Sequence, residues 1–174
     1  MTHADITIAD AQTSDVRRLR ELAVEVKIDA WSEAHYAEEI RRPEAFVIKA
    51  TKSGRLVGFL LARTVTGTTE KPDADLYNIA VVADLQGRGI ATSLLGELLL
   101  RLRKIETGSL WLEVRESNHR AIEFYERHGF ETELTRPNFY TAPVENAVIM
   151  RLRLHPESDP SDALRMLDSN FEQE

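Results

Sequence analysis

The spacing of hydrophobic and polar residues in the first part of the chain predicts a strand followed by a helix. Ile6 and Ile8 alternate with polar residues, which is typical of a half-buried strand. Thr13 or Ser14 can cap the helix that follows, and apolar residues then recur at helical spacing through Val26.

The next segment predicts a second short helix and a β-hairpin. The helix opens at Trp31-Ser32, with Ser32 as its cap, and ends near Pro43. Two apolar runs of strand length follow, Ala45–Ala50 and Leu56–Val65. Between them Lys52-Ser53-Gly54-Arg55 has the composition of a tight hairpin turn.

A strand, a turn, a helix and a second strand are predicted in the middle of the chain. After a polar loop at Thr66–Ala74, Leu76–Val82 is an apolar run of strand length, and Gln86–Ala91 is a turn that contains glycine. Apolar residues then lie on one helical face from Ile90 to Leu102, and Leu110–Val114 is another strand. A strand that returns through a helix needs a crossover connection, so these two strands are expected to be parallel.

The last predicted elements are a helix and two strands. Ser117 is expected to cap a helix through His128, and Gly129 stands where a left-handed helix end belongs. Strands are expected near Phe130–Leu134 and Val144–Leu154. The fold class is therefore α/β (α+β): a mixed, mostly antiparallel sheet of six to seven strands with a central parallel pair, flanked by about four helices.

Composition narrows the classes of protein that fit. The 174 residues suit one domain, expected over 1–154, and contain no cysteine, which excludes disulfides, thiolate metal sites and a cysteine nucleophile. The net charge is −7, and residues 155–174 carry six acids and one base, which predicts an acidic, mobile tail on a nearly neutral body. Neither nucleic-acid binding nor a membrane segment is expected, and the N-terminus does not read as a signal peptide, so the default location is the cytoplasm.

The turn between Leu76–Val82 and the helix after it has the features of an anion site. Glycine lets the backbone approach a ligand closely, and the free N–H groups of a helix start attract a phosphate. Gln86-x-x-Gly89-x-Ala91 is thus suited to a pyrophosphate. A strand-to-helix turn that uses glycine only for its geometry would read the same, so this motif by itself leaves both interpretations open.

A second segment, Leu110–Phe130, decides between them. Together, Q-x-x-G-x-A after a strand, then L-E-V on a strand, then S-N-x-x-A-I-x-x-Y-E-x-x-G-F resemble the GNAT superfamily of N-acetyltransferases. More narrowly, the chain resembles the bacterial ribosomal-protein-alanine N-acetyltransferases, the RimI type, also at Trp31–Glu33 and Arg136–Tyr140. The resemblance covers roughly residues 5–154.

The resemblance implies acetyl-CoA as co-substrate and a role for each matching residue. Glu113 matches the family's proton acceptor and Tyr125 its proton donor. Asn118 would contact the cofactor near its thiol. The remaining cofactor-binding residues would hold the pantetheine arm through the backbone of the strand and the pyrophosphate through the turn: Ile79, Ala80 and Val81, then Gln86, Gly87, Arg88, Gly89, Ile90, Ala91 and Thr92.

The chain departs from the family's pattern at three places. Ala30 stands where a proline is common, and Gly87 stands where a basic residue often follows the glutamine, which removes one phosphate partner. The C-terminal segment Arg136–Pro143, which is expected to be a loop, reads RPNFYTAP instead of R-x-N-Y-Y-P. This last difference falls where the family grips its peptide, so it concerns the acceptor more than the reaction.

The chemistry of amine acetylation agrees with these residue types. A protein α-amine, with a pKa of about 7.7–8.0, is partly neutral near pH 7, whereas a lysine at about 10.4 is not. A carboxylate such as Glu113 therefore suffices as base, and Tyr125 can protonate the thiolate.

The favoured function is acetylation of a protein N-terminus, with a ribosomal protein as the favoured partner. A small-amine acetyltransferase and a non-catalytic acetyl-CoA-binding domain are the alternatives, and Glu113 and Tyr125 argue against the second of these. No metal is expected, because His119 and His128 have no third ligand at metal spacing, and both are expected on the helix surface. Trp111 is expected in the core, and Gly96, inside a helix, is expected to mark close packing.

Overall fold

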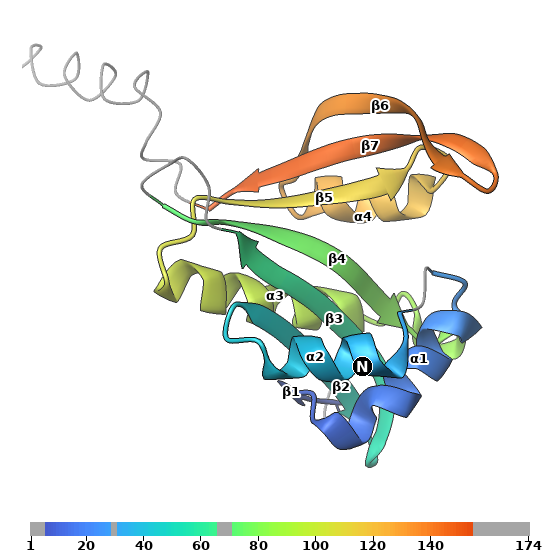
Figure 1. Cartoon of the computed structure of the whole chain (residues 1–174), viewed down its shortest axis with the longest axis vertical. Coiled ribbons are helices and arrows are strands. Elements are labelled where there is room, and N and C mark those ends of the chain that lie inside the picture. The colour runs from blue at the N-terminus through green and yellow to red at the C-terminus, as the bar shows by residue number, and fades with distance from the viewer. Residues whose placement is uncertain (1–5, 29–30, 66–70, 155–174) are drawn as a thin grey trace, which may run out of the picture.

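The computed structural model describes residues 6–28, 31–65 and 71–154, which form one seven-stranded sheet with four α-helices (Figure 1). The strands lie in the order β1-β2-β3-β4-β5-β7-β6. Only β4 and β5 are parallel, which confirms the mixed, mostly antiparallel sheet with its central parallel pair. The strands are β1 (Ile6–Asp10), β2 (Ala45–Lys52), β3 (Arg55–Val65), β4 (Asp73–Val81), β5 (Ser109–Arg115), β6 (Glu131–Thr141) and β7 (Val144–Arg153).

The helices cover both faces of the sheet. Figure 1 shows α1 (Val16–Glu25) and α2 (Glu33–Arg41) in front of β2 and β3, with α3 (Ile90–Lys104) behind them and α4 (His119–Arg127) against the C-terminal strands. Because β3 is covered from both sides, every residue from Leu56 to Ala62 is buried. The core is thus centred on β3, and β4 pairs with β3 along one edge.

Two local predictions in the first half are confirmed in detail. The hydroxyl of Ser32 caps α2 by accepting a hydrogen bond of 3.2 Å from the backbone N–H of His35. In the β2–β3 hairpin Ser53 and Gly54 both have positive φ, 48° and 76°. Two positive φ values are what a type I′ turn needs, and that turn matches the twist of the flanking strands.

Two predicted helix caps are wrong by one residue. Neither Thr13 nor Ser14 starts the first helix, because a 3₁₀ turn over Thr13–Asp15 begins at Gln12, whose N–H donates to Asp15 Oδ2 over 2.7 Å. The cap of α4 is Asn118, whose side chain accepts from the N–H of Ala121. Ser117 instead donates its backbone N–H to Glu145. Both shifts arise because a neighbouring acidic or amide side chain is the better acceptor.

The C-terminal hairpin differs most from its prediction. The strand expected near Phe130–Leu134 continues as β6 to Thr141, so the segment interpreted as a loop is a strand. Pro137 is tolerated because β6 is an edge strand, where its missing N–H breaks no ladder. The register also shifts between Arg136 and Tyr140, and Asn138 has a positive φ of 52° within that irregularity.

Two smaller expectations are corrected. The loop predicted to reach Ala74 ends earlier, because Asp73 and Ala74 already pair with β3, and Ala74 also pairs with β5. Of the glycines, it is Gly58 and not Gly96 that marks close packing. A methyl group on Gly58 would come within 2.9 Å of the Ala80 carbonyl oxygen, whereas one on Gly96 would meet nothing within 4 Å.

The tail expected at 155–174 lies outside the described residues, as does most of the loop expected at Thr66–Ala74. In the part of the chain that the structure describes, none of the helices is both long and apolar enough to cross a membrane.

Candidate functional site: a cavity between two diverging strands

The parallel strands β4 and β5 separate partway along their length. They pair at Ala74, Asp75 and Leu76 of β4 and no further, although β4 continues to Val81. A β-bulge at Tyr77 accompanies the separation, since Leu61 and Ala62 of β3 pair with Asn78 and Leu76 and skip the residue between them. A bulge bends and twists its strand, so β4 turns away from β5 (Figure 1). The edge of β4 that faces β5 is left open from Tyr77 onward.

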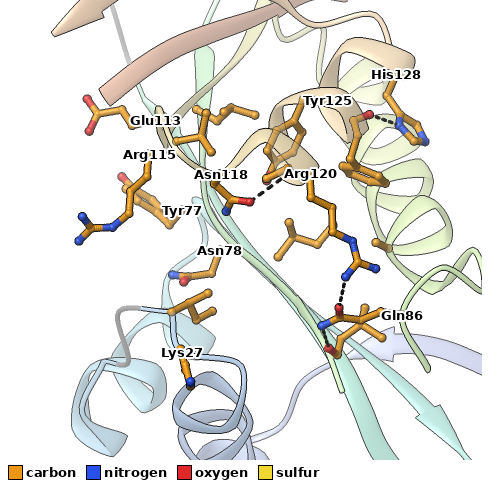
Figure 2. Close-up of a pocket in the computed structure, with 18 of the residues that line it drawn as sticks. Lys27, Tyr77, Asn78, Gln86, Glu113, Arg115, Asn118, Arg120, Tyr125 and His128 are labelled. Carbon is orange, nitrogen blue, oxygen red and sulfur yellow. Dashed lines mark hydrogen bonds between the residues drawn. The ribbon is translucent and has the colours of Figure 1, made fainter. Parts of the chain in front are cut away.

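A cavity of about 1280 Å³ lies along this opening. Its lining comes from β4, β5, the turn before α3, α4, and the β6–β7 hairpin. Figure 2 shows Glu113 and Arg115 toward one end of it and Gln86 and Arg120 toward the other. The divergence of two strands therefore creates a long site that crosses the sheet, with a different chemistry at each end.

One end of the cavity has the features of an anion site. Gly89 caps α3 in the left-handed conformation, with φ of 80°, and Gly87 is also left-handed at 75°. The first helical hydrogen bond of α3 runs from the N–H of Ser93 to the Gly89 oxygen over 2.9 Å. The N–H groups of Ile90, Ala91 and Thr92 precede that bond and lie in the first turn, where a helix directs its free donors and its positive dipole at a ligand.

Gln86 braces this end from within. Its side-chain Nε2 donates to the Val81 oxygen over 2.9 Å, and its Oε1 accepts from Arg120 Nη1 over 2.7 Å (Figure 2). The amide thus ties the end of β4 to α4 across the cavity. Arg120 also brings a positive charge to the turn. The GNAT pattern often has a basic residue at the position of Gly87, which has no side chain to supply that charge.

The structure brings most of the predicted cofactor residues to this cavity. Its lining includes Ile79, Val81, Gln86, Gly87, Gly89, Ile90, Ala91, Thr92 and Asn118. Ala80 and Arg88 are outside it: Ala80 is buried, with its carbonyl against Gly58, and the side chain of Arg88 is exposed. The predicted contact of Ala80 was through its backbone, so its buried side chain does not bear on that prediction.

Several cavity residues were missed by the sequence analysis. Arg120, Phe124, Arg127 and His128 of α4 and its C-cap all line the cavity, and their spacing of three, four and seven places them on one helical face. His128 was expected at the helix surface but is half-buried. Its Nδ1 lies 2.7 Å from the Phe124 oxygen and its Nε2 3.2 Å from Thr92 Oγ1, which joins α4 to the first turn of α3. His119, by contrast, is exposed as expected.

Glu113 and Tyr125 line the same cavity from different elements and in different environments. Glu113 on β5 is exposed, and Oε1 accepts a hydrogen bond of 2.7 Å from Arg136 of β6. Tyr125 on α4 is only 7% exposed and packs against the rings of Phe124 and Phe130. Burial raises the pKa of the Tyr125 phenol well above its ordinary value, so the hydroxyl keeps its proton throughout the physiological range.

Asn118 has a structural task besides its predicted contact with the cofactor. Its Oδ1 accepts from the Ala121 N–H over 3.2 Å as the cap of α4, and the side chain borders the cavity. The side-chain NH₂ group retains donors for a ligand.

The opposite end of the cavity is aromatic and is bordered by the last hairpin. Trp31, Tyr77, Trp111, Phe139 and Tyr140 line it. The Trp31 and Tyr77 ring centroids are 5.6 Å apart, and the guanidinium of Arg115 lies 3.9 Å from the centroid of Tyr140. Trp111 is thus a half-buried wall of the site and not the core residue that its sequence context indicates.

These features fit the parts of acetyl-CoA in order. The first turn of α3, with Gly87 and Gly89 open to the cavity, suits a pyrophosphate. The open edge of β4 suits the amide groups of a pantetheine arm, because a strand edge presents unpaired N–H and C=O groups. Across the described residues no cluster of three or more His, Cys, Asp or Glu side chains could hold a metal ion.

Comparison with known proteins defines the class to which this fold and site belong. The model of the acetyltransferase (GNAT) family matches residues 16–130, and the chain belongs to that family. It is accordingly an N-acetyltransferase with acetyl-CoA as its acetyl donor.

Two curated relatives and one solved structure make the likeness more specific. The chain is 34% identical to [ribosomal protein bS18]-alanine N-acetyltransferase of Escherichia coli K12 over 149 residues, 84% of this chain and 96% of the relative. It is 31% identical to the N-alpha-acetyltransferase RimI of Mycobacterium tuberculosis over 158 residues, 90% of this chain and 96% of the relative. The crystal structure of the E. coli ribosomal-protein-S18-alanine N-acetyltransferase superposes with a TM-score of 0.77 and 31% identity, covering 89% of this chain and 97% of that one.

Proposed function

We propose that this enzyme acetylates the N-terminal α-amine of a protein, with a ribosomal protein as the favoured acceptor. One observation carries the proposal: at the end far from the turn suited to phosphate, the cavity is lined by Glu113 together with Trp31 and residues of the β6–β7 hairpin. An extended peptide end can enter there. The similarity to relatives named [ribosomal protein bS18]-alanine N-acetyltransferase supports the same class of acceptor. A ribosomal acceptor would place the reaction in the cytoplasm.

In the proposed reaction one amide bond forms and one thioester bond breaks. The amine nitrogen loses one proton to Glu113, the departing sulfur gains one from Tyr125, and solvent afterwards carries the proton from Glu113 back to Tyr125. The thioester supplies the acetyl group. Glu113, directly or through a water molecule, accepts the proton that the attacking amine gives up. Tyr125 donates its hydroxyl proton to the departing sulfur, and its raised pKa keeps that proton in place until the sulfur becomes negative.

The bound amine explains how Glu113 can act although it is paired in the free protein. Both partners of the Glu113–Arg136 pair are largely exposed, with side-chain exposures of 39% and 54%. An exposed pair of this kind contributes about 0–1 kcal/mol, so an incoming amine can compete with Arg136 for the carboxylate.

Two peptides of one sequence test the proposed acceptor. One has a free N-terminus and no lysine, and the other is blocked at its N-terminus and carries a lysine. Mass spectrometry after incubation with acetyl-CoA locates the acetyl group. We expect efficient modification of the free α-amine only. Preferential modification of the lysine, or of small amines such as spermidine with both peptides untouched, would overturn the proposal.

A further inference from the structure

Asp75 carries a carboxylate on the same face of the sheet as Glu113. In the sheet register Asp75 of β4 lies between Arg63 of β3 and Trp111 of β5, and side chains at paired positions share a face. Arg63 reaches Glu39 of α2, so this is the face that α2 covers. Glu113 stands two residues beyond Trp111 and points the same way. Both Asp75 and Glu113 line the cavity.

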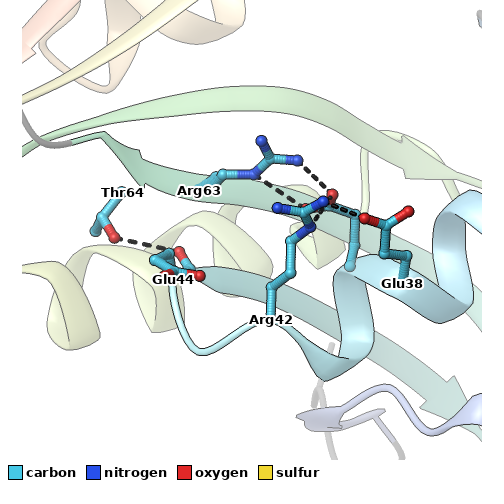
Figure 3. A network of polar contacts seen from close by, with 6 residues as sticks. Glu38, Arg42, Glu44, Arg63 and Thr64 are labelled. Atoms are coloured by element: carbon cyan, nitrogen blue, oxygen red, sulfur yellow. Dashed lines mark hydrogen bonds and ion pairs between the residues drawn. The ribbon is translucent and has the colours of Figure 1, made fainter.

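The two donors that flank Asp75 in the sheet register, Arg63 and Trp111, are committed to other acceptors. Arg63 directs Nε and Nη2 at the two carboxylate oxygens of Glu39, which Arg42 also approaches (Figure 3). The Trp111 indole N–H donates to Asp73 over 3.1 Å. Among the described residues Asp75 makes no hydrogen bond and no ion pair. It is a cavity carboxylate whose neighbours leave it without a partner.

An unpartnered, half-buried carboxylate is costly for a fold, and such groups concentrate where a ligand supplies the partner. Burial raises the pKa of Asp75, the nearby charge of Asp73 raises it further, and Arg63 acts in the opposite direction. The folded protein by itself therefore disfavours the charged form of Asp75. A cation that enters the cavity would restore it.

The surroundings of Asp75 define the chemistry of that cation. Trp31, Tyr77 and Trp111 line the cavity with it, and aromatic faces beside a carboxylate suit a guanidinium or an ammonium group. One strand spacing and two residues of rise separate Asp75 from Glu113, which places their Cα atoms about 8 Å apart. If the reacting amine lies at Glu113, a side chain from the second or third residue of an extended peptide reaches Asp75.

We propose that Asp75 is a specificity-determining residue that binds a basic side chain, arginine or lysine, at the second or third position of the acceptor peptide. This inference rests on the proposed function, because it places the terminal amine at Glu113. It adds a substrate preference that the reaction does not require: the enzyme selects acceptor peptides by the charge of a residue beyond the first.

Peptides that differ at one position test this selection. One series carries Arg, Gln or Glu at the second residue and another carries the same three at the third, with all other residues neutral. The kcat/KM for acetyl transfer is measured for each, and calorimetry in the presence of CoA measures peptide binding without turnover. We expect the parent enzyme to prefer Arg over Gln at one of the two positions by about tenfold, since one desolvated charge pair supplies that much affinity.

Asp75→Asn is expected to reduce that preference to less than about threefold while the Gln peptides react nearly as before. Glu97→Gln is the matched control, because it removes a carboxylate from α3, behind the sheet, and should leave the preference intact. A parent enzyme that does not discriminate, or an Asp75→Asn variant that still does, would overturn the inference and leave the proposed function standing. An equal loss on all peptides would also overturn it, since Asp75 would then bind the amine itself.

Thermal unfolding separates this role from a structural one. The pKa of Asp75 is raised in the folded protein, so its ionisation above the unfolded pKa of about 3.9 costs stability. Asp75→Asn should therefore raise the Tm at pH 7, and the gain should disappear at a pH below that value. A lowered Tm at pH 7 would mean that the carboxylate is needed for folding and would contradict the inference. If no peptide α-amine is acetylated at all, the proposed function fails first and this inference fails with it.

Discussion

Arg136 Nη1 lies 2.7 Å from Glu113 Oε1, so the expected proton acceptor is already ion-paired in the free protein. The two residues come from β6 and β5, which are separated in the sheet by β7. Their contact crosses the strand between them on one face. Glu113 is therefore held in place by the hairpin that also borders the proposed acceptor end of the cavity.

This pair predicts unequal effects of two substitutions. Glu113→Gln removes the proton acceptor and should lower kcat by about 10²–10⁴-fold, the usual contribution of a general base. Arg136→Gln removes only an exposed partner worth about 0–1 kcal/mol and should change kcat by less than about fivefold. Steady-state kinetics with a free N-terminal peptide measures both. A larger loss for Arg136→Gln would mean that the arginine itself takes part in the reaction.

Replacement of Tyr125 by phenylalanine should lower turnover without weakening cofactor binding. The hydroxyl is lost, but the ring contacts with Phe124 and Phe130 remain, so the fold should be retained. A general acid contributes about 10²–10⁴-fold, and kcat should fall by that order. Calorimetry with acetyl-CoA is expected to give a Kd within about twofold of the parent. An unchanged kcat would return Tyr125 to a packing role.

The pH dependence of kcat/KM should have a rising limb and no falling limb below about pH 10. The rise follows deprotonation of the acceptor α-amine, with a pKa of about 7.7–8.0. Burial raises the pKa of Tyr125 above its ordinary value of about 10, so the proton donor stays loaded over this range. Rates between pH 6 and 10 test this. A falling limb near pH 9 that vanishes in Tyr125→Phe would show that Tyr125 titrates in the ordinary range.

Gly89→Glu should abolish tight binding of acetyl-CoA, because it places a negative charge and a side chain at the anion end of the cavity. The variant also strains a left-handed position with φ of 80°. Gly54→Glu is the matched control: φ is 76°, the position is in the β2–β3 turn, and a Cβ there meets nothing within 4 Å. Calorimetry should give a Kd raised at least about 100-fold for the first variant and unchanged for the second. If both variants bound acetyl-CoA equally tightly, the turn at Gly89 would not be the site that holds the phosphates.

Gly96→Ala should stabilise the protein. Gly96 lies inside α3 with open space at the Cβ position, so alanine gains about 0.5–1 kcal/mol of helix propensity without a clash. For a domain of this size that corresponds to a Tm raised by about 1–4 °C. Gly58→Ala provides the contrast, because its methyl group would lie 2.9 Å from the Ala80 oxygen, and its Tm should fall. Calorimetric scans of the two variants measure both Tm values and test whether Gly58, and not Gly96, is the closely packed glycine of the pair.

The elements that the sequence determined by itself are those whose cause is local. Apolar spacing located the helices and most strands, the side chain of Ser32 capped α2, and Ser53-Gly54 made the hairpin turn. The motif around Gln86–Ala91 predicted an anion site, because a helix start and its glycines are contiguous in the chain, although the same motif also fits a turn that uses glycine only for its geometry. The predictions for Glu113 and Tyr125 came from resemblance, and their spacing alone would also fit a surface residue and a core residue.

What only the tertiary structure decided depends on contacts between distant segments. The bulge at Tyr77 opens the cavity, yet it is defined by the register against β3 and has no local signal. Arg120 meets Gln86 and His128 meets Thr92 only because α4 packs beside the start of α3. The isolation of Asp75 is likewise set by where Glu39 and Asp73 direct the neighbouring donors. Hydrophobic periodicity predicts on which face of a helix or strand a residue lies, but the sheet register and the helix packing decide which side chain it contacts there.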